Sequence, residues 1–187
     1  MLDDHLALLV GRVILAWGLF DQQFHATIRS LEQALDEPQT SEGRFNERRK
    51  LFRRYCIRLI QNDKITADLD RFLGRLQKLE RFRGRLAHGW VNEVDGGVEC
   101  YDFAEATDDK KDVQPREWFI PLDQLRSLPD DIENARGEVI RFQFVAIERR
   151  ELLAGRPSFL QWRTRQTQDR QSPPDPSKPS DTEKGAS

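Results

Sequence analysis

An arginine and a histidine five positions apart, Arg83 and His88, are the residues whose types and spacing suggest catalysis. Histidine exchanges protons near neutral pH, and arginine presents a planar fork of N–H donors that suits a phosphate. Together they supply the minimum for cleaving an RNA phosphodiester by attack of the neighbouring 2′-hydroxyl, since one side chain moves protons and the other stabilises charge developing on phosphorus. The pair predicts a ribonuclease site that needs no metal.

Other common signatures of catalysis are missing from the sequence. It has no His-Glu-x-x-His run, no cysteine quartet and no carboxylate array to bind a metal, and no glycine-rich loop followed by Lys-Ser or Lys-Thr to hold a nucleoside triphosphate. The two cysteines, Cys56 and Cys100, lack metal-ligand spacing and are expected to be free thiols. We therefore expect neither a metal nor another cofactor.

Three helices are predicted up to His88, because apolar residues recur every three or four positions. The first spans residues 6–35 and ends before Pro38, which cannot continue a helix. The second spans about residues 44–61. The third ends at Gly89, the residue type expected at a left-handed helix C-cap. Its apolar seam consists of Leu69, Phe72, Leu76 and Leu79.

Arg83 occupies a position of this seam where the spacing calls for an apolar residue. A guanidinium is costly to bury alone, so Arg83 needs an acidic partner, a bound anion or an opening to water. Five residues along a helix correspond to a rotation of about 140°. Arg83 and His88 are therefore not expected to share a face unless the helix frays at Gly89 or a second copy of the motif completes the site.

After Trp90 the apolar pattern changes to the alternation typical of strands. Residues 90–94 and 98–103 flank the turn at residues 95–97 and predict a β-hairpin, and residues 117–120 predict a third strand. A last helix is expected from Leu122 or Asp130 to Leu153. We predict a mainly α fold in one domain, residues 1–160, with an insertion of strands at about 90–121. The polar, proline-rich residues 161–187 are expected to be disordered.

Positive charge is concentrated in the middle of the chain, although the net charge is −2. Counting from the sequence, residues 42–90 hold 14 basic and 6 acidic groups, a balance of +8. Such a block can attract phosphate. The alternative is a solvated helix face with no ligand. The candidate phosphate-binding residues are Arg85, Arg48, Arg49 and Arg53.

The run RGRLAHGW at residues 83–90, at the end of a third helix, resembles the HEPN superfamily (higher eukaryotes and prokaryotes nucleotide-binding), in which an Arg-x(4–6)-His motif closes an equivalent helix. The resemblance covers about residues 6–155. It implies a helical bundle, a homodimer and a metal-independent endoribonuclease site where two motifs meet. Arg83 would be the motif arginine and His88 the motif histidine. A toxin or defence role, with a nucleotidyltransferase-like antitoxin as partner, is the corresponding expectation.

One position departs from the family pattern and keeps a second interpretation open. Many members have a polar residue, frequently asparagine, directly after the motif arginine, whereas this chain has Gly84. A non-catalytic dimeric module that binds RNA or serves as a protein scaffold is therefore the alternative function. Asp21, on the polar side of the first helix, is a candidate for orienting the motif.

A purely structural interpretation of the motif also stands. His88 would cap the helix, Trp90 would anchor the hairpin, and Arg83 would pair with Glu80 or with an acid on the first helix.

The longest apolar stretch, residues 6–20, is too short to span a bilayer and contains Arg12. It also lacks the basic flank and cleavage site of a signal peptide. We expect a soluble cytoplasmic protein with no membrane association.

Overall fold

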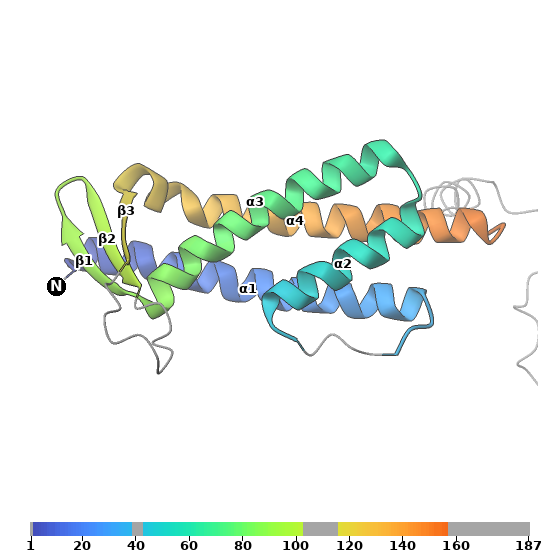
Figure 1. Cartoon of the computed structure of the whole chain (residues 1–187), viewed down its shortest axis with the longest axis horizontal. Helices are drawn as coiled ribbons and strands as arrows, with labels where there is room; N and C mark the ends of the chain where they lie inside the picture. Colours follow the sequence, from blue (N-terminus) through green and yellow to red (C-terminus); the bar gives the residue numbers. More distant parts are fainter. Residues whose placement is uncertain (1, 39–42, 103–115, 157–187) are drawn as a thin grey trace, which may run out of the picture. The chain divides into compact units, whose positions relative to one another are not determined.

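The computed structural model describes residues 2–38, 43–102 and 116–156. The chain divides into two compact units, residues 1–150 and 151–187. Figure 1 shows the helices and the strands. The elements are α1 (Asp4–Ala34), α2 (Phe45–Ile60), α3 (Asp63–His88), β1 (Trp90–Val94), β2 (Gly97–Asp102), β3 (Arg116–Pro121) and α4 (Leu122–Leu153). The predicted mainly α fold with a small sheet after the third helix is confirmed, while the predicted disorder of residues 161–187 lies outside the described residues.

Local side-chain chemistry sets the ends of the helices that lead to the motif. The Asp3 carboxylate accepts a hydrogen bond from the Leu6 N–H at 2.7 Å and begins α1. The Asn62 side chain does the same for the Ile65 N–H at 3.1 Å and begins α3. These caps satisfy amide groups that the first helical turn leaves without an intrahelical acceptor. They fix where each helix starts and therefore which face each residue occupies.

Gly89 ends α3, but not in the left-handed conformation predicted for it. Its φ is −83° and its ψ is 163°, which is extended backbone. The requirement for glycine is steric, because a Cβ atom there would lie 2.4 Å from the Arg85 carbonyl oxygen and 3.1 Å from that of Tyr101. The Gly89 N–H donates to the same Arg85 carbonyl at 2.9 Å. The chain thus turns directly from the helix into β1.

The three strands form an antiparallel sheet in the order β1-β2-β3. The hairpin turn is shorter than predicted, since Gly97 already belongs to β2 and faces Pro121. A Cβ at Gly97 would lie 2.3 Å from the Ile120 carbonyl oxygen, so glycine permits this close approach. Three apolar side chains on one face of the sheet are fully buried: Val98, Cys100 and Ile120.

The last helix begins at Leu122, the earlier of the two predicted starts, and contains Pro129. A proline inside a helix removes one backbone hydrogen bond and commonly bends the helix. Leu128 and Ile132, on either side of Pro129, are both buried, so the apolar face continues through the proline. Burial in the core therefore accounts for the early start.

The core that positions the motif is rich in aromatic side chains. Five rings from α1 and α2 lie with centroids 5.1–6.4 Å apart, in the range of favourable ring contacts. They are Trp17, Phe20, Phe24, Phe45 and Phe52. On α3, Phe72 packs against Phe142 of α4 with centroids 5.6 Å apart. The predicted seam of α3 is therefore the face that α1 and α4 cover.

Candidate active site at the end of α3

Arg83 and His88 meet within one chain. Arg83 Nη1 lies 3.3 Å from His88 Nε2, and α3 remains helical through His88. The two side chains therefore make contact within an unfrayed helix, although their positions are about 140° apart around its axis. The physical reason is the long, flexible stem of arginine, which carries the guanidinium around the helix to the imidazole.

The environment of Arg83 explains how a guanidinium is tolerated in an apolar seam. Its Cζ lies 5.5 Å from the centroid of the Trp17 ring, and the side chain is half-buried. A cation over an indole face gains electrostatic attraction while the guanidinium edge stays open to other partners. Of the three environments expected for the Arg83 guanidinium, the structure shows the opening to water. The contact with the Trp17 ring is added to it. No ion pair with Glu80 is formed within the described part of the chain.

The Arg83–His88 contact favours one tautomer of a neutral imidazole. A guanidinium can only donate, so Nε2 accepts from Arg83 and the imidazole hydrogen lies on Nδ1. An imidazole with an unprotonated nitrogen is the form that accepts a proton as a general base. His88 is exposed, so its ring is accessible from solvent.

Arg85 lies beside the motif and is stacked on a tryptophan. Its Cζ is 3.4 Å from the centroid of the Trp118 ring of β3 and 5.9 Å from that of Phe82. The same charge acts on the thiol of Cys100 beneath the sheet. Burial raises the pKa of Cys100 to about 11, and the Arg85 charge opposes that rise. Arg85 is therefore the one proposed phosphate-binding residue that lies within the motif itself, three residues before His88 on α3.

Asp21 and Arg48, predicted for separate roles, form an ion pair with each other. Arg48 Nη2 lies 2.7 Å from Asp21 Oδ1, and the Arg48 side chain is only 11% exposed. The pair joins α2 to α1. Neither residue forms a hydrogen bond or ion pair with Arg83 or His88 within the residues that the structure describes.

The two other arginines of α2 that were predicted to bind phosphate also have partners within the chain. Arg53 forms a two-pronged contact with Asp70, with N–O distances of 2.7 and 3.0 Å. The hydrogen bond with Arg53 lowers the pKa of Asp70, and the same bond raises the pKa of Arg53. Arg49 Nη1 donates to the Leu73 carbonyl oxygen at 3.4 Å. The positive face of α2 therefore links α2 to its neighbours.

One further cation shares a face with the motif histidine. Arg81, Arg85 and His88 are separated by four and three residues, the spacing that aligns side chains on one face of a helix. Arg81 is exposed. Charge counting does not distinguish Arg81 from other arginines, but this spacing relative to His88 does. The last turns of α3 thus present two arginines and a histidine in a row.

Trp90 does not anchor the hairpin, contrary to one of the predicted alternatives. Its side chain is 67% exposed, and its indole N–H donates to Asn92 Oδ1 at 3.0 Å. The sheet is instead held to the bundle by the fully buried side chains of its other face. Two hydrogen bonds at its edge assist: the Asp3 N–H donates to Glu93 at 3.0 Å, and the Leu122 N–H donates to the Gly96 carbonyl at 2.9 Å.

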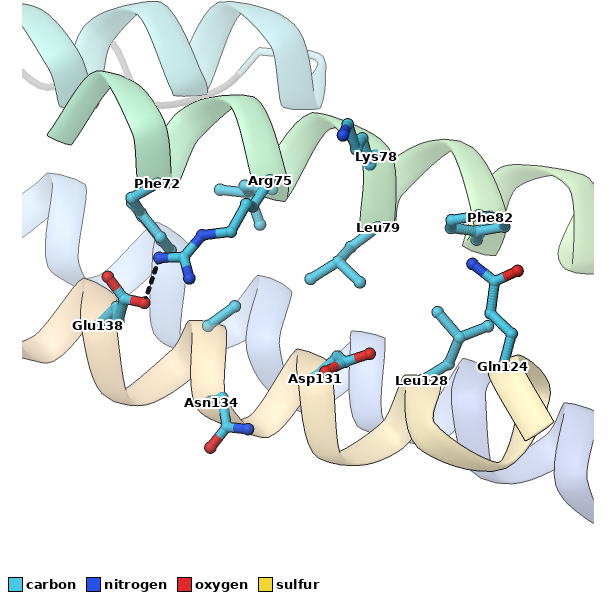
Figure 2. Close-up of a pocket in the computed structure, with 12 residues that line it drawn as sticks. Phe72, Arg75, Lys78, Leu79, Phe82, Gln124, Leu128, Asp131, Asn134 and Glu138 are labelled. Carbon is cyan, nitrogen blue, oxygen red and sulfur yellow. Dashed lines mark hydrogen bonds and ion pairs between the residues drawn. The ribbon is translucent and has the colours of Figure 1, made fainter. Parts of the chain in front are cut away.

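A groove between α3 and α4 lies near the motif, with Phe82 among its lining residues. It has a volume of about 310 Å³ and is lined by residues of both helices. Figure 2 shows Leu79 of α3 and Leu128 of α4 pointing into it. Neither Arg83 nor His88 lines the groove. It is therefore a separate feature from the candidate active site.

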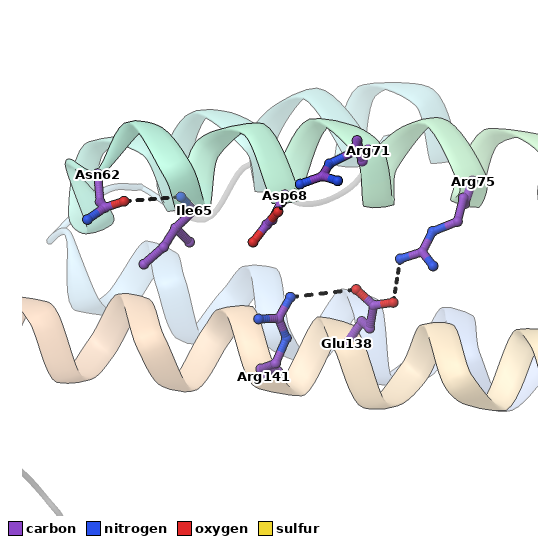
Figure 3. A network of polar contacts seen from close by, with 7 residues as sticks. All are labelled: Asn62, Ile65, Asp68, Arg71, Arg75, Glu138 and Arg141. Carbon is purple, nitrogen blue, oxygen red and sulfur yellow. Dashed lines mark hydrogen bonds and ion pairs between the residues drawn. The ribbon is translucent and has the colours of Figure 1, made fainter.

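The far end of this groove is crossed by a network of charges, shown in Figure 3. Glu138 of α4 accepts from Arg75 of α3 at 2.5 Å and lies 3.7 Å from Arg141. Asp68 and Arg71 form a neighbouring ion pair on α3. The network links α3 to α4. Because its acids neutralise part of the local positive charge, it is a weaker candidate for binding phosphate than the end of α3.

Within residues 2–38, 43–102 and 116–156, no three side chains of His, Cys, Asp or Glu gather closely enough to hold a metal ion. Over the same residues, no helix has the length and apolar character needed to cross a membrane.

Comparison of the chain with protein-family models, curated protein sequences and solved structures gives no significant match.

Proposed function

We propose that this protein is a metal-independent endoribonuclease whose catalytic residues are Arg83 and His88. The observation that supports the proposal is the 3.3 Å contact between the two side chains at an exposed helix end. RNA is the proposed substrate because the pair suits attack by a 2′-hydroxyl, which DNA lacks. A cytoplasmic toxin or defence component, held inactive by a nucleotidyltransferase-like antitoxin, is the proposed setting.

The proposed mechanism uses the two side chains in turn. A phosphodiester bound by Arg83 draws the guanidinium from His88 and frees Nε2. His88 then accepts the 2′-hydroxyl proton while the 2′-oxygen forms a bond to phosphorus and the bond to the 5′-oxygen breaks. The 5′-oxygen leaves with a proton from water, and the hydroxide that remains takes up the proton that His88 accepted. The products are a 2′,3′-cyclic phosphate and a 5′-hydroxyl, and Arg83 stabilises the charge on the phosphoryl oxygens in between.

The first test is cleavage of total and transfer RNA in EDTA by the wild-type protein, His88→Ala and the control His5→Ala. His5 is also exposed but lies at the start of α1, on a different helix from the motif. We expect cleavage by the wild type and His5→Ala, with 2′,3′-cyclic ends, and a loss of about 100-fold or more in His88→Ala, the typical size of general acid–base catalysis. Equal cleavage by all three proteins, or by none, would contradict the proposal.

A mixing experiment decides whether one chain or two supply the site. The resemblance to HEPN proteins implies a composite site between two motifs, whereas the contact seen here joins Arg83 and His88 of the same chain. Arg83→Ala and His88→Ala are each expected to be inactive. If one chain supplies both groups, mixing the two variants leaves the activity absent. Recovery of cleavage on mixing would establish the composite site.

The second candidate function is a non-catalytic dimeric module that binds RNA or serves as a protein scaffold. Gly84 favours it, since the position after the motif arginine lacks a polar side chain. The ion pairs of Arg48 and Arg53 weigh against α2 as an RNA surface, which leaves the scaffold as the stronger version. This candidate predicts partner binding that does not change in His88→Ala and no cleavage by the wild type.

A further inference from the structure

The outer face of α1 exposes large apolar side chains that the core does not use. Leu8 is 57%, Leu15 66% and Leu19 50% exposed, whereas Trp17 between the last two is only 3% exposed. Residues two apart on a helix lie about 200° apart around its axis, so the exposed leucines lie opposite the core. A helix that is apolar on both sides commonly has a second packing partner.

The exposed face follows the spacing of a helix pair. Positions on it alternate by four and three residues, as in helices that pack side by side along their length. They are Asp4, Leu8, Gly11, Leu15, Gly18, Gln22, His25 and Arg29. All but His25, which is half-buried, are exposed. The pattern thus continues along almost the whole of α1.

The charges at the two ends of this face select the orientation of a partner. Asp4 lies at its start and Arg29 near its end, and neither forms an ion pair within the described residues. A second copy packed parallel would set Asp4 against Asp4 and Arg29 against Arg29. A copy packed antiparallel sets each Asp4 against an Arg29, so opposite charges meet at both ends.

The antiparallel register also matches bulky side chains to open positions. With Asp4 opposite Arg29 of the second copy, the two-fold axis passes between residues 16 and 17, and Leu15 faces Gly18. Gly18 is exposed and has free space where a Cβ would stand, so it offers a hollow for the leucine. One helix therefore carries both halves of the contact.

We infer that the outer face of α1 binds the same face of a second copy of this chain in antiparallel orientation. The inference does not rest on the proposed ribonuclease activity. Arg83 contacts Trp17 on the opposite side of α1, so two helix widths, about 20 Å, separate the two motifs in this dimer. Each Arg83–His88 pair therefore stays accessible and separate from its copy.

The size of the face sets the expected strength of the dimer. A stripe from Asp4 to Arg29 is about 38 Å long at about 1.5 Å per residue. With a width of about 10 Å, it covers about 400 Å² on each copy, or about 800 Å² in total, which is below the size of stable specific interfaces and typical of weak, transient ones. The dimer is therefore expected to be reversible and to form as the protein concentration rises.

Sedimentation velocity of the full chain over a range of concentrations tests the inference. The wild type is expected to shift from monomer to dimer. Leu15→Glu places two carboxylates at the centre of the contact and is expected to raise the dissociation constant by about tenfold or more. The control is Leu153→Glu on α4, where the leucine is 58% exposed and outside the face. It is expected to dimerise like the wild type.

A charge exchange tests the orientation without touching the leucines. Asp4→Arg is expected to weaken the dimer, because it sets two cations against each other, and adding Arg29→Asp is expected to restore it. Circular dichroism confirms that each variant is folded. A wild type that stays monomeric, a dimer indifferent to Leu15→Glu, or a double variant no stronger than Asp4→Arg would overturn the inference. Cleavage of RNA has no part in these outcomes, so the two proposals fail separately.

Discussion

At the scale of single residues, most arginines of the positive block are joined to acids or carbonyl groups of the same chain. Arg48 pairs with Asp21, Arg53 with Asp70, and Arg49 donates to a carbonyl of α3. An arginine that is already paired must give up that partner before it can bind a phosphate. Arg83, at the end of α3, contacts a histidine and an indole ring instead of an acid, so it is better suited to bind an RNA phosphate.

The Arg53–Asp70 pair gives a prediction about stability and pH. The folded pKa of Asp70 lies below its unfolded value, so the pair contributes fully above the unfolded pKa, about 3.9, and its contribution is lost as the pH falls through the folded pKa. Both side chains are nearly half exposed, so screening limits the effect. Asp70→Asn is expected to lower the free energy of unfolding at neutral pH by about 0.2–1 kcal/mol.

Urea unfolding at neutral pH and at a pH below the folded pKa of Asp70 measures this difference. The wild type and Asp70→Asn are expected to converge in acid. Arg53→Gln and the double variant complete a double-mutant cycle and isolate the pair from other effects of each substitution. A difference that is equal at both pH values would show that Asp70 acts through something other than its charge.

At the scale of elements, the end of α3 and the start of β1 are one structural unit. The turn at Gly89 places β1 directly after the motif, and the buried face of the sheet packs on the bundle. The motif therefore lies where the end of α3 meets the first strand of the sheet, β1. A change in the turn should move His88, while a change in the preceding helical turn should not.

Two glycine substitutions test this difference. Gly84→Ala adds a methyl group where nothing lies within 4 Å, so it is expected to stabilise the helix by about 0.4–1 kcal/mol. Gly89→Ala would bring a Cβ within 2.4 Å of a backbone oxygen and is expected to destabilise the protein by about 1–3 kcal/mol. Thermal unfolding of the two variants measures both effects. If they shift the melting temperature alike, the close approach at Gly89 is not maintained in solution.

At the scale of the whole molecule, α1 has two functions on opposite sides. Its inner face carries the aromatic core and supports Arg83 through Trp17. Its outer face carries the exposed leucines that we propose contact a second copy of the chain. Dimerisation and catalysis would then use different surfaces of the same helix, and each active site would work without its copy.

This arrangement predicts that Leu15→Glu cleaves RNA at the same rate per chain as the wild type, even at concentrations where only the wild type is dimeric. Leu15 lies on the face opposite Trp17 and Arg83, so the substitution leaves the motif unchanged. Initial rates of cleavage across a concentration series measure this. A rate per chain that falls together with the dimer would instead favour the composite site between two motifs.

The sequence by itself determined the helices, the hairpin and the position of the motif. Caps, apolar periods and turn residues act over a few neighbouring positions, so the bounds of α1, α2 and β1 were predicted to within a few residues. The sequence does not decide whether α4 starts at Leu122 or at Asp130. Pro129 is unfavourable inside a helix, and only burial of the neighbouring side chains in the core outweighs this cost.

Only the tertiary structure decided which side chains meet. The contact of Arg83 with Trp17 and the pairing of Arg48 with Asp21 join residues far apart in the sequence, and such contacts depend on how helices are set against each other. The approach of Arg83 to His88 depends on the path of one long side chain, which periodicity does not encode. The sequence therefore determined which groups the chain carries, and packing determined which of them remain available for chemistry.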